Sequence, residues 1–237
     1  MLAPLEILKT PYSVILLHHN GEVDNVEEFT HIWNNATVRL AVDGGTNSWY
    51  SAQRANCQLK LPHIVSGDFD SIKPEILTYV ENLEDVKVVR TPDQDETDFT
   101  KAFQILRSTY DDTTLPKTVV TLTSNKTGRF DQQMSTVSTL VKTLETDLQV
   151  YLYDYKNLIF ALRPNEERDI LLRTQLTCGI IPIDGPTVMK TQGLKWDLDG
   201  CYRFGDMIST SNETVLDTVK IQANRVFLFT LEVLLLH

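Results

Sequence analysis

Short apolar runs alternate with helical segments from Ser13 to about Asp154, and this alternation limits the fold more than any other feature of the chain. Six runs have the length and composition of strands: SVILL, TVRLAV, HIV, VKVV, TVVTL and QVYLY. The segments between them have helical periodicity, at about 24–34, 46–56, 73–82, 96–109 and 131–145. Alternation of this kind implies a mainly parallel sheet with helices on its faces. We therefore expect a Rossmann-like α/β domain over residues 1–154.

The pattern changes after about residue 155. The later apolar runs are short and bounded by Asn, Asp, Gly or Pro: NLIFAL, DILLR, CGIIPI, TVMKT, RFGDMIS, TVLDTVKIQ and VFLFTLEVLLL. No helical stripe connects them, which is typical of an all-β sandwich or open barrel. The last run is too short to span a bilayer and contains Glu232, so it reads as a buried strand. The predicted fold class is α/β plus β, with a sandwich domain over residues 155–237.

Composition and charge narrow the possible partners. The 237 residues are 42% hydrophobic and carry a formal net charge of −10, so we expect a globular protein that binds neither nucleic acid nor membrane. Glu6 and Lys9 interrupt the apolar residues at the amino end, which argues against a secretory signal. Three widely spaced cysteines, Cys57, Cys178 and Cys201, indicate reduced thiols and a cytoplasmic location.

Polar residues, many of them acidic, follow four of the predicted strands. Because the carboxyl ends of parallel strands meet at one edge, where ligands of such sheets bind, these residues should converge. They are Asp43 with Asn47, Asp68 with Asp70, the stretch 94–101, and the stretch 129–132.

Asp68 and Asp70 are the strongest metal candidates. Two carboxylates this close repel each other unless a cation lies between them, and hard oxygen ligands suit Mg²⁺. A bound divalent cation would also reconcile an acidic chain with an anionic substrate. For Asp43 or Ser71 alone, a helix cap is an equally good interpretation.

Asp98 and Lys101, in the predicted helix near Glu96, have two possible interpretations. Asp98 and Lys101 are three residues apart and share a helix face, as a surface ion pair would. Alternatively, Asp98 completes a metal site while Lys101 meets a phosphate at the helix amino terminus. Arg129 is suited to grip a phosphate through two parallel hydrogen bonds. The chain has neither a Walker loop nor a full Rossmann glycine fingerprint.

Taken in order, these segments resemble eukaryotic thiamin pyrophosphokinases. The matching motifs of the first half are Asp-Gly-Gly-x-Asn from Asp43, Gly-Asp-Phe-Asp-Ser from Gly67, Pro-Asp-Gln-Asp-x-Thr-Asp-Phe-Thr-Lys from Pro92 and Gly-Arg-Phe-Asp-Gln from Gly128. Those of the second half are Cys-Gly-Ile-Ile-Pro from Cys178, Gly-Leu-Lys-Trp from Gly193 and Ser-Thr-Ser-Asn from Ser209. The resemblance covers about residues 38–212.

The resemblance implies an α/β catalytic domain at 1–154 that binds ATP and Mg²⁺, and a β-sandwich thiamin-binding domain at 155–237. It also implies a homodimer with active sites at the subunit interface. The implied magnesium ligands are Asp68, Asp70 and Asp98, with Asp43 nearby. Together with Arg129, the three ligands would be the catalytic residues.

The resemblance further implies which side chains meet the substrates. ATP phosphates would be held by Gln94, Thr97, Lys101 and Arg129, with Asp43, Asn47, Asp131 and Gln132 lining the same cleft. Ser209 and Asn212 match the motif that meets thiamin. Trp196 is either a stacking partner for the electron-poor thiamin ring or a core aromatic of the sandwich.

Two departures from the family pattern are visible. The loop Thr123–Thr127 stands where the family has a glycine pair and one residue fewer, and glycine allows close backbone approach to a phosphate. Phe229 stands where the family has a tryptophan.

The implied reaction is direct attack of the thiamin hydroxyl on the β-phosphorus of ATP, with Asp98 or Asp131 accepting the proton. Positioning and charge stabilisation dominate such transfers. One alternative is a nucleotide-sugar glycosyltransferase, which also holds a metal through Asp-x-Asp. Another is a catalytically silent module that binds thiamin or a nucleotide, which the altered loop Thr123–Thr127 would favour.

Overall fold

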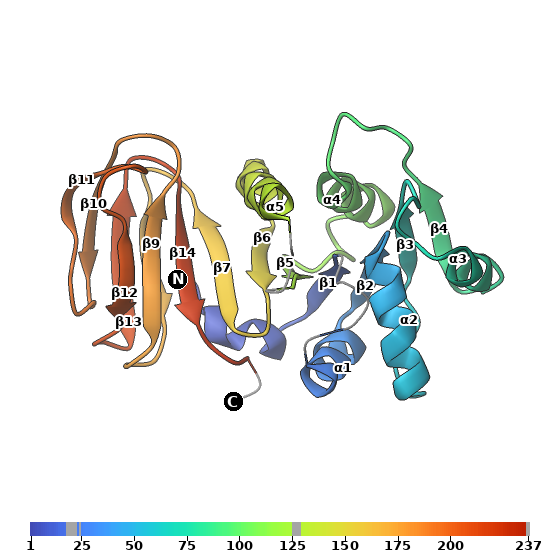
Figure 1. The fold of residues 1–237 in the computed structure, drawn as a ribbon. Helices are drawn as coiled ribbons and strands as arrows, with labels where there is room; N and C mark the ends of the chain where they lie inside the picture. The colour runs from blue at the N-terminus through green and yellow to red at the C-terminus, as the bar shows by residue number, and fades with distance from the viewer. Residues whose placement is uncertain (18–22, 24, 125–128, 236–237) are drawn as a thin grey trace. The chain divides into compact units, whose positions relative to one another are not determined.

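The computed structural model describes residues 1–17, 23, 25–124 and 129–235 (Figure 1). The chain forms two compact units. The α/β unit holds Pro11–Thr143 and Asp147–Tyr155. The β-rich unit holds Met1–Thr10, Leu144–Thr146 and Lys156–His237.

The α/β unit is built on parallel strands in the order β6-β5-β1-β2-β3-β4. Their bounds are β1 Tyr12–Leu16, β2 Val38–Val42, β3 Ile64–Gly67, β4 Lys87–Arg90, β5 Thr118–Leu122 and β6 Gln149–Tyr153. Every residue of β1 is buried, as expected of a central strand covered on both faces. The predicted mainly parallel sheet is therefore confirmed.

In the described parts of the connections between these strands lie five α-helices. They are α1 Val26–Asn35, α2 Gly45–Ala55, α3 Pro74–Glu81, α4 Asp98–Thr109 and α5 Phe130–Lys142. In Figure 1, α4 and α5 lie on one side of the sheet, and α1 and α2 lie on the other. The strands from β1 to β4 follow one another across the sheet in one direction, and β5 to β6 follow in the opposite direction. Because each crossover is right-handed, the helices of these two series lie on opposite sides of the sheet.

Local sequence explains where the helices begin. The side chain of Thr97 accepts a hydrogen bond from Thr100 N at 3.2 Å and so caps α4. Asn25 and Glu28 bond each other reciprocally at the start of α1, because Glu28 N donates to Asn25 Oδ1 and Asn25 Nδ2 donates to Glu28 Oε2. Pro74 opens α3, where its missing N–H costs nothing.

The β-rich unit contains two sheets of antiparallel strands. One has the order β12-β9-β14-β7, and the other has the order β11-β10-β13-β8. The bounds are β7 Asn157–Leu162, β8 Glu167–Leu171, β9 Thr177–Pro182, β10 Thr187–Gln192, β11 Asp199–Tyr202, β12 Ser209–Glu213, β13 Thr218–Ala223 and β14 Phe227–Glu232. The predicted all-β sandwich is confirmed.

Burial along the strands explains this packing. Residues of β10 alternate strictly between buried and exposed, as in a sheet with one face in the core. Phe229 is fully buried in β14, and its ring stacks on Phe160 of β7 with centroids 5.4 Å apart. Phe229, where the resemblance implies a tryptophan, is therefore a core residue.

Several elements differ from the sequence prediction. Apart from its last residue, Ser209, which begins β12, RFGDMIS is the connection between β11 and β12, although its apolar residues suggested a strand. Arg203 and Asp206 form an ion pair across it, and Gly205 has φ +101°, which fits a turn. The helix predicted over 131–145 ends at Lys142 and continues as a 3₁₀ turn, Thr143–Glu145.

The amino-terminal residues pack within the β-rich unit. A 3₁₀ helix spans Pro4–Lys9. Leu2 pairs with the edge strand β8, since Leu2 N donates to Asp169 O at 2.9 Å and Leu171 N donates to Leu2 O at 2.7 Å. Among the described helices, none has the length and apolar character required to cross a bilayer.

Candidate functional site

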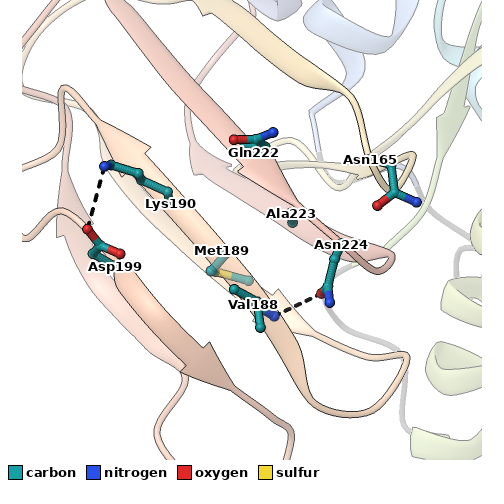
Figure 2. Close-up of a pocket in the computed structure, with 8 residues that line it drawn as sticks. All are labelled: Asn165, Val188, Met189, Lys190, Asp199, Gln222, Ala223 and Asn224. Carbon is teal, nitrogen blue, oxygen red and sulfur yellow. Dashed lines mark hydrogen bonds and ion pairs between the residues drawn. The ribbon is translucent and has the colours of Figure 1, made fainter.

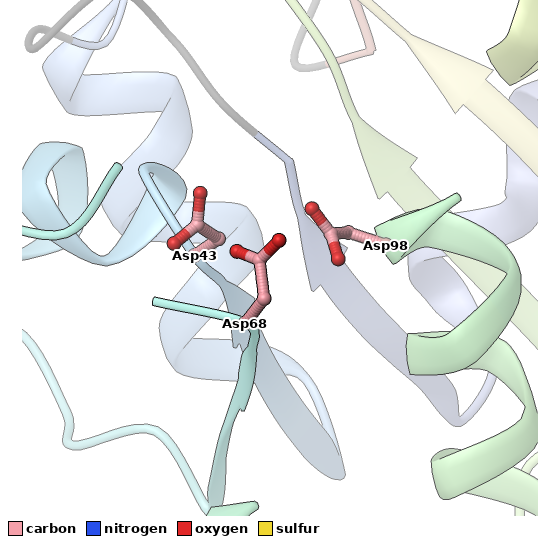
Figure 3. Close-up of side chains that lie close together, drawn as sticks. All are labelled: Asp43, Asp68 and Asp98. Atoms are coloured by element: carbon pink, nitrogen blue, oxygen red, sulfur yellow. The ribbon is translucent and has the colours of Figure 1, made fainter. Parts of the chain in front are cut away.

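Three carboxylates meet at the carboxyl edge of the parallel sheet (Figure 3). Asp43 follows β2, Asp68 follows β3, and Asp98 is the first residue of α4. Each contributes one oxygen to a group in which all three atoms lie within 4.8 Å of one another. Oxygen ligands at this spacing fit a hard divalent cation, which would offset their mutual repulsion.

The three acids differ in electrostatic environment. Burial raises the pKa of the Asp43 carboxyl, and the nearby charge of Asp98 adds to this effect. A hydrogen bond from Gln94 Nε2 to Asp68 Oδ2, at 2.8 Å, lowers the pKa of Asp68. Burial therefore favours the neutral form of Asp43, whereas the hydrogen bond from Gln94 favours the ionised form of Asp68.

The backbone around these acids depends on two glycines. At Gly67, which has φ +152°, an added Cβ would lie 2.8 Å from Asp43 Cβ. At Gly45, an added Cβ would lie 2.6 Å from Leu16 O, so glycine lets the start of α2 approach the end of β1. Phe69 has φ 68°, a left-handed conformation that costs energy in a bulky residue and must be held by its surroundings.

Asp70, predicted as a metal ligand, lies outside this group of three. Its side chain is exposed, and its Oδ1 accepts a hydrogen bond from Ser71 Oγ at 2.7 Å. The structure brings Asp43 to Asp68 and Asp98 instead. No side-chain cap of α2 by Asp43 is present, since the cap residue of that helix is Gly44. The role of Asp70 stays a prediction.

Lys101 is buried, so the interpretation of its pair with Asp98 as a surface ion pair is wrong. Its Nζ lies 2.8 Å from Asp98 Oδ1 and donates to Thr91 O at 3.0 Å and Asp93 O at 2.9 Å. Only 9% of its side chain is exposed. Lys101 therefore ties the loop after β4 to the start of α4, and its contact with a phosphate stays a prediction.

Two other predicted phosphate-binding residues also contact protein groups. Gln94 bonds Asp68 as described above. The hydroxyl of Thr97 lies 3.0 Å from that of Thr100 and 3.2 Å from that of Thr139, which links α4 to α5. Both residues are exposed. They lie beside the acidic edge, by which we mean the part of the sheet's carboxyl edge where Asp43, Asp68 and Asp98 meet, and their hydrogen bonds help to order it.

Arg129, Asp131 and Gln132 lie exposed at the start of α5. The guanidinium of Arg129 pairs with Asp131 through both carboxylate oxygens, with Nε 3.2 Å from Oδ1. This fork presents the geometry that also fits a phosphate. Of the divergent loop Thr123–Thr127, residues 125–127 lie outside the described residues, as does Gly128.

The predicted thiamin-binding residues come together in the β-rich unit. Asn212 is buried, and its Nδ2 donates to Ser209 Oγ at 3.0 Å and to Trp196 O at 2.9 Å. Its Oδ1 accepts from Trp196 N at 3.2 Å. Trp196 is 56% exposed, and Lys195 Nζ lies 5.0 Å from its ring centroid. Trp196 is therefore not a core aromatic, and its stacking on thiamin stays a prediction.

A cavity of about 330 Å³ lies on the sheet that contains β10, β11 and β13 (Figure 2). Asn224 Oδ1 accepts from Val188 N at 2.9 Å beside it, and Lys190 pairs with Asp199 at 3.7 Å. None of the predicted site residues lines this cavity. We therefore place the candidate functional site at the acidic edge, where three carboxylates converge, and not at this cavity.

The fold and the acidic edge together define a two-unit protein whose α/β unit carries a candidate site for a divalent cation. The family described as "Thiamin pyrophosphokinase, catalytic domain" matches residues 29–152, and "Thiamin pyrophosphokinase, vitamin B1 binding domain" matches residues 163–228. The chain belongs to the thiamin pyrophosphokinase family.

Individual proteins similar to this chain are named as members of the same family. Thiamin pyrophosphokinase 1 of Caenorhabditis elegans is 33% identical over 98% of this chain and 94% of its own. Thiamine pyrophosphokinase 2 of Arabidopsis thaliana is 28% identical over 96% of this chain and 88% of its own. The structure of thiamin pyrophosphokinase from Candida albicans superposes with a TM-score of 0.83, at 20% identity, over 98% of this chain and 92% of that one, which shows a shared fold.

Proposed function

We propose that this chain transfers a pyrophosphoryl group from ATP to the hydroxyl of thiamin, which gives thiamin diphosphate and AMP. The observation that carries the proposal is the meeting of Asp43, Asp68 and Asp98 in a chain of this family. The named activity of its relatives supports the choice of substrates.

Mg²⁺ is the proposed metal. The oxygens of Asp43, Asp68 and Asp98 are the ligand type that Mg²⁺ prefers, and their spacing fits one ion. Asp70 is exposed on the loop that also carries Asp68, so we propose it as a further ligand. When bound, Mg²⁺ neutralises negative charge on phosphate oxygens.

The protein's own groups bind and orient the substrates. In the proposed reaction the thiamin oxygen forms a bond to the β-phosphorus, and the bond from that phosphorus to the oxygen shared with the α-phosphate breaks, so that AMP leaves with this oxygen. Arg129 exchanges its contact with Asp131 for a phosphate, which the shared fork geometry favours. Asp98 or Asp131 accepts the hydroxyl proton.

We further propose that residues 1–154 bind ATP and residues 155–237 bind thiamin. The buried amide of Asn212 holds the backbone of Trp196, which supports an exposed indole as a platform for the thiamin ring. Two copies of the chain would form a dimer with active sites at their interface. Exposed apolar side chains such as Phe204 and Met207 support a protein partner. The exposed free thiols of Cys57 and Cys201 support a reducing, cytoplasmic setting.

The test is AMP release by the purified protein from ATP and Mg²⁺, with and without thiamin. We expect thiamin-dependent AMP formation, matched mole for mole by thiamin diphosphate and abolished by a chelator. Thiamin binding without AMP would indicate a silent binding module. Preference for a uridine nucleotide sugar would indicate a glycosyltransferase.

A further inference from the structure

We propose that Asn47 is a positioning residue that sets the distance between Asp43 and Asp68. This inference rests on the proposed function, because it concerns the carboxylates assigned to the metal. Asn47 lies in the first turn of α2, four residues after Asp43, and is buried.

The side-chain amide of Asn47 uses both of its ends on the loop that follows β3. Its Nδ2 donates to Ser71 O at 2.8 Å, and its Oδ1 accepts from Lys73 N at 3.0 Å. Both partners are backbone atoms, so the amide fixes the course of the loop whatever its side chains are. The amide therefore joins the first turn of α2 to this loop through two hydrogen bonds.

The same loop carries Asp68, and Ser71 also bonds it to Asp43, which lies between β2 and α2. Ser71 N donates to Asp43 Oδ1 at 3.3 Å, a longer bond than either made by Asn47. Phe69, within the loop, holds φ 68°, a conformation that a bulky residue leaves unless it is restrained. The Asn47 amide supplies two of the restraints that keep Asp68 beside Asp43.

Loss of this amide should therefore loosen the loop and spread the carboxylates. Alanine at position 47 leaves α2 intact, because alanine favours helix more than asparagine does. The substitution should therefore lower the affinity for the metal, as substitutions of residues that orient metal ligands without binding the metal do.

Asn34 offers a matched control. It lies in α1, and its amide makes the same kind of double bridge: Nδ2 donates to Gln58 O at 3.1 Å, and Oδ1 accepts from Lys60 N at 2.8 Å. That loop precedes β3 and so belongs to the amino edge of the sheet, away from the three acids.

The experiment measures Mn²⁺ affinity by electron paramagnetic resonance on the whole protein, with Mn²⁺ as the only ligand. Mn²⁺ shares the preference of Mg²⁺ for carboxylate and water. We expect Asn47→Ala to raise the Kd for Mn²⁺ by about 10- to 100-fold. Asn34→Ala should leave this Kd unchanged, even where its thermal midpoint falls. Asn47→Gln, which keeps a donor and an acceptor, should give a smaller rise and serves in place of Asn47→Ala if that variant does not fold.

Wild-type affinity in folded Asn47→Ala would overturn the inference, and so would an equal loss of affinity in Asn34→Ala. A wild-type protein that binds no Mn²⁺ would overturn the metal site and this role together. Failure of the proposed function is recognised separately, as absence of thiamin-dependent AMP from wild-type protein that does bind Mn²⁺.

Discussion

The hydroxyl of Tyr153, at the end of β6, donates a 2.6 Å hydrogen bond to Oε1 of Glu28 in α1, and both side chains are buried. The second carboxylate oxygen of Glu28 accepts from Asn25 Nδ2 at 3.2 Å. A pair 125 residues apart in sequence thus anchors α1 to β6, the last parallel strand of the α/β unit. A buried carboxylate that loses a donor is costly, so this contact is a point at which the stability of the α/β unit can be tested.

Tyr153→Phe should lower the free energy of unfolding by about 1–3 kcal/mol, because it leaves Glu28 buried without this donor. Chemical denaturation monitored by circular dichroism measures the change. Tyr79→Phe is the control, since Tyr79 is exposed and its hydroxyl makes a longer bond, 3.4 Å, to Gln53. The control should stay within about 0.5 kcal/mol of wild type. Equal losses in the two variants would contradict the importance of the buried pair.

Substitution of the acids separates the metal ligands from their neighbours. Asp43→Asn, Asp68→Asn and Asp98→Asn should each lower kcat by at least about 100-fold while the fold is retained, because each removes a charge from the proposed metal site. Turnover and circular dichroism of the same preparations measure this. Near-normal turnover in any one of them would remove that residue from the site.

Asp70→Asn decides whether the exposed acid shares this role. The sequence pattern predicts loss of turnover with an intact fold, whereas the structure leaves Asp70 outside the group of three oxygens. Retained turnover in Asp70→Asn would assign the metal to Asp43, Asp68 and Asp98 alone.

Gly67→Ala should reduce turnover by crowding Asp43. Both Gly67 and Gly185 have positive φ, but an added Cβ meets Asp43 Cβ at 2.8 Å in the first case and nothing within 4 Å in the second. Gly185→Ala therefore controls for backbone strain. We expect Gly185→Ala to lose stability on the order of 1 kcal/mol from strain with kcat unchanged, and Gly67→Ala to lose more stability and also kcat, because its Cβ meets Asp43 as well. Equal kcat values would show that the close approach does not matter for the site.

Asp111 should give a pH-dependent contribution to stability. Its Oδ1 accepts from the hydroxyl of Thr113 at 2.6 Å and from Thr114 N at 2.9 Å, and such bonds lower the pKa of this carboxyl from 3.8 to about 2. Because the folded-state pKa is depressed, the contribution is present in full above pH 3.8 and is lost as the pH falls through about 2.

Carboxyl chemical shifts of Asp111 followed by NMR measure this titration directly. The denaturation midpoint of Asp111→Ala should lie below that of wild type at neutral pH, and the difference should shrink in acid. A titration midpoint at the ordinary value for aspartate would contradict the assigned hydrogen bonds.

The sequence predicted the sheet well because strands and helices have local signatures. TVRLAV and TVVTL are β-branched runs, and both became buried parallel strands. The prediction of a strand over RFGDMIS was wrong because Phe204 and Met207 are apolar, yet both are exposed in the connection between β11 and β12. The short strand Asp199–Tyr202 was missed because its residues carry little strand composition.

The acidic site was predicted in part, and the missing part depends on three-dimensional detail. Motif spacing indicates that Asp68 and Asp98 share an edge, as they do. It does not say whether Asp43 or Asp70 joins them, because that depends on the left-handed turn at Phe69 and on the close passage of Gly67. The engagement of Lys101 by backbone carbonyls likewise depends on the path of the loop after β4, which no short motif encodes.

The three clustered carboxylates come from positions 25 and 30 residues apart in the sequence. No single segment of the polypeptide therefore contains all three carboxylates, and a chain emerging from the ribosome lacks this cluster until α4 has docked beside β2 and β3. Affinity for a metal at the proposed site would in this sense be a property of the finished tertiary structure. During refolding, its recovery reports the moment at which these distant segments have assembled, and it would lag behind the formation of the individual helices.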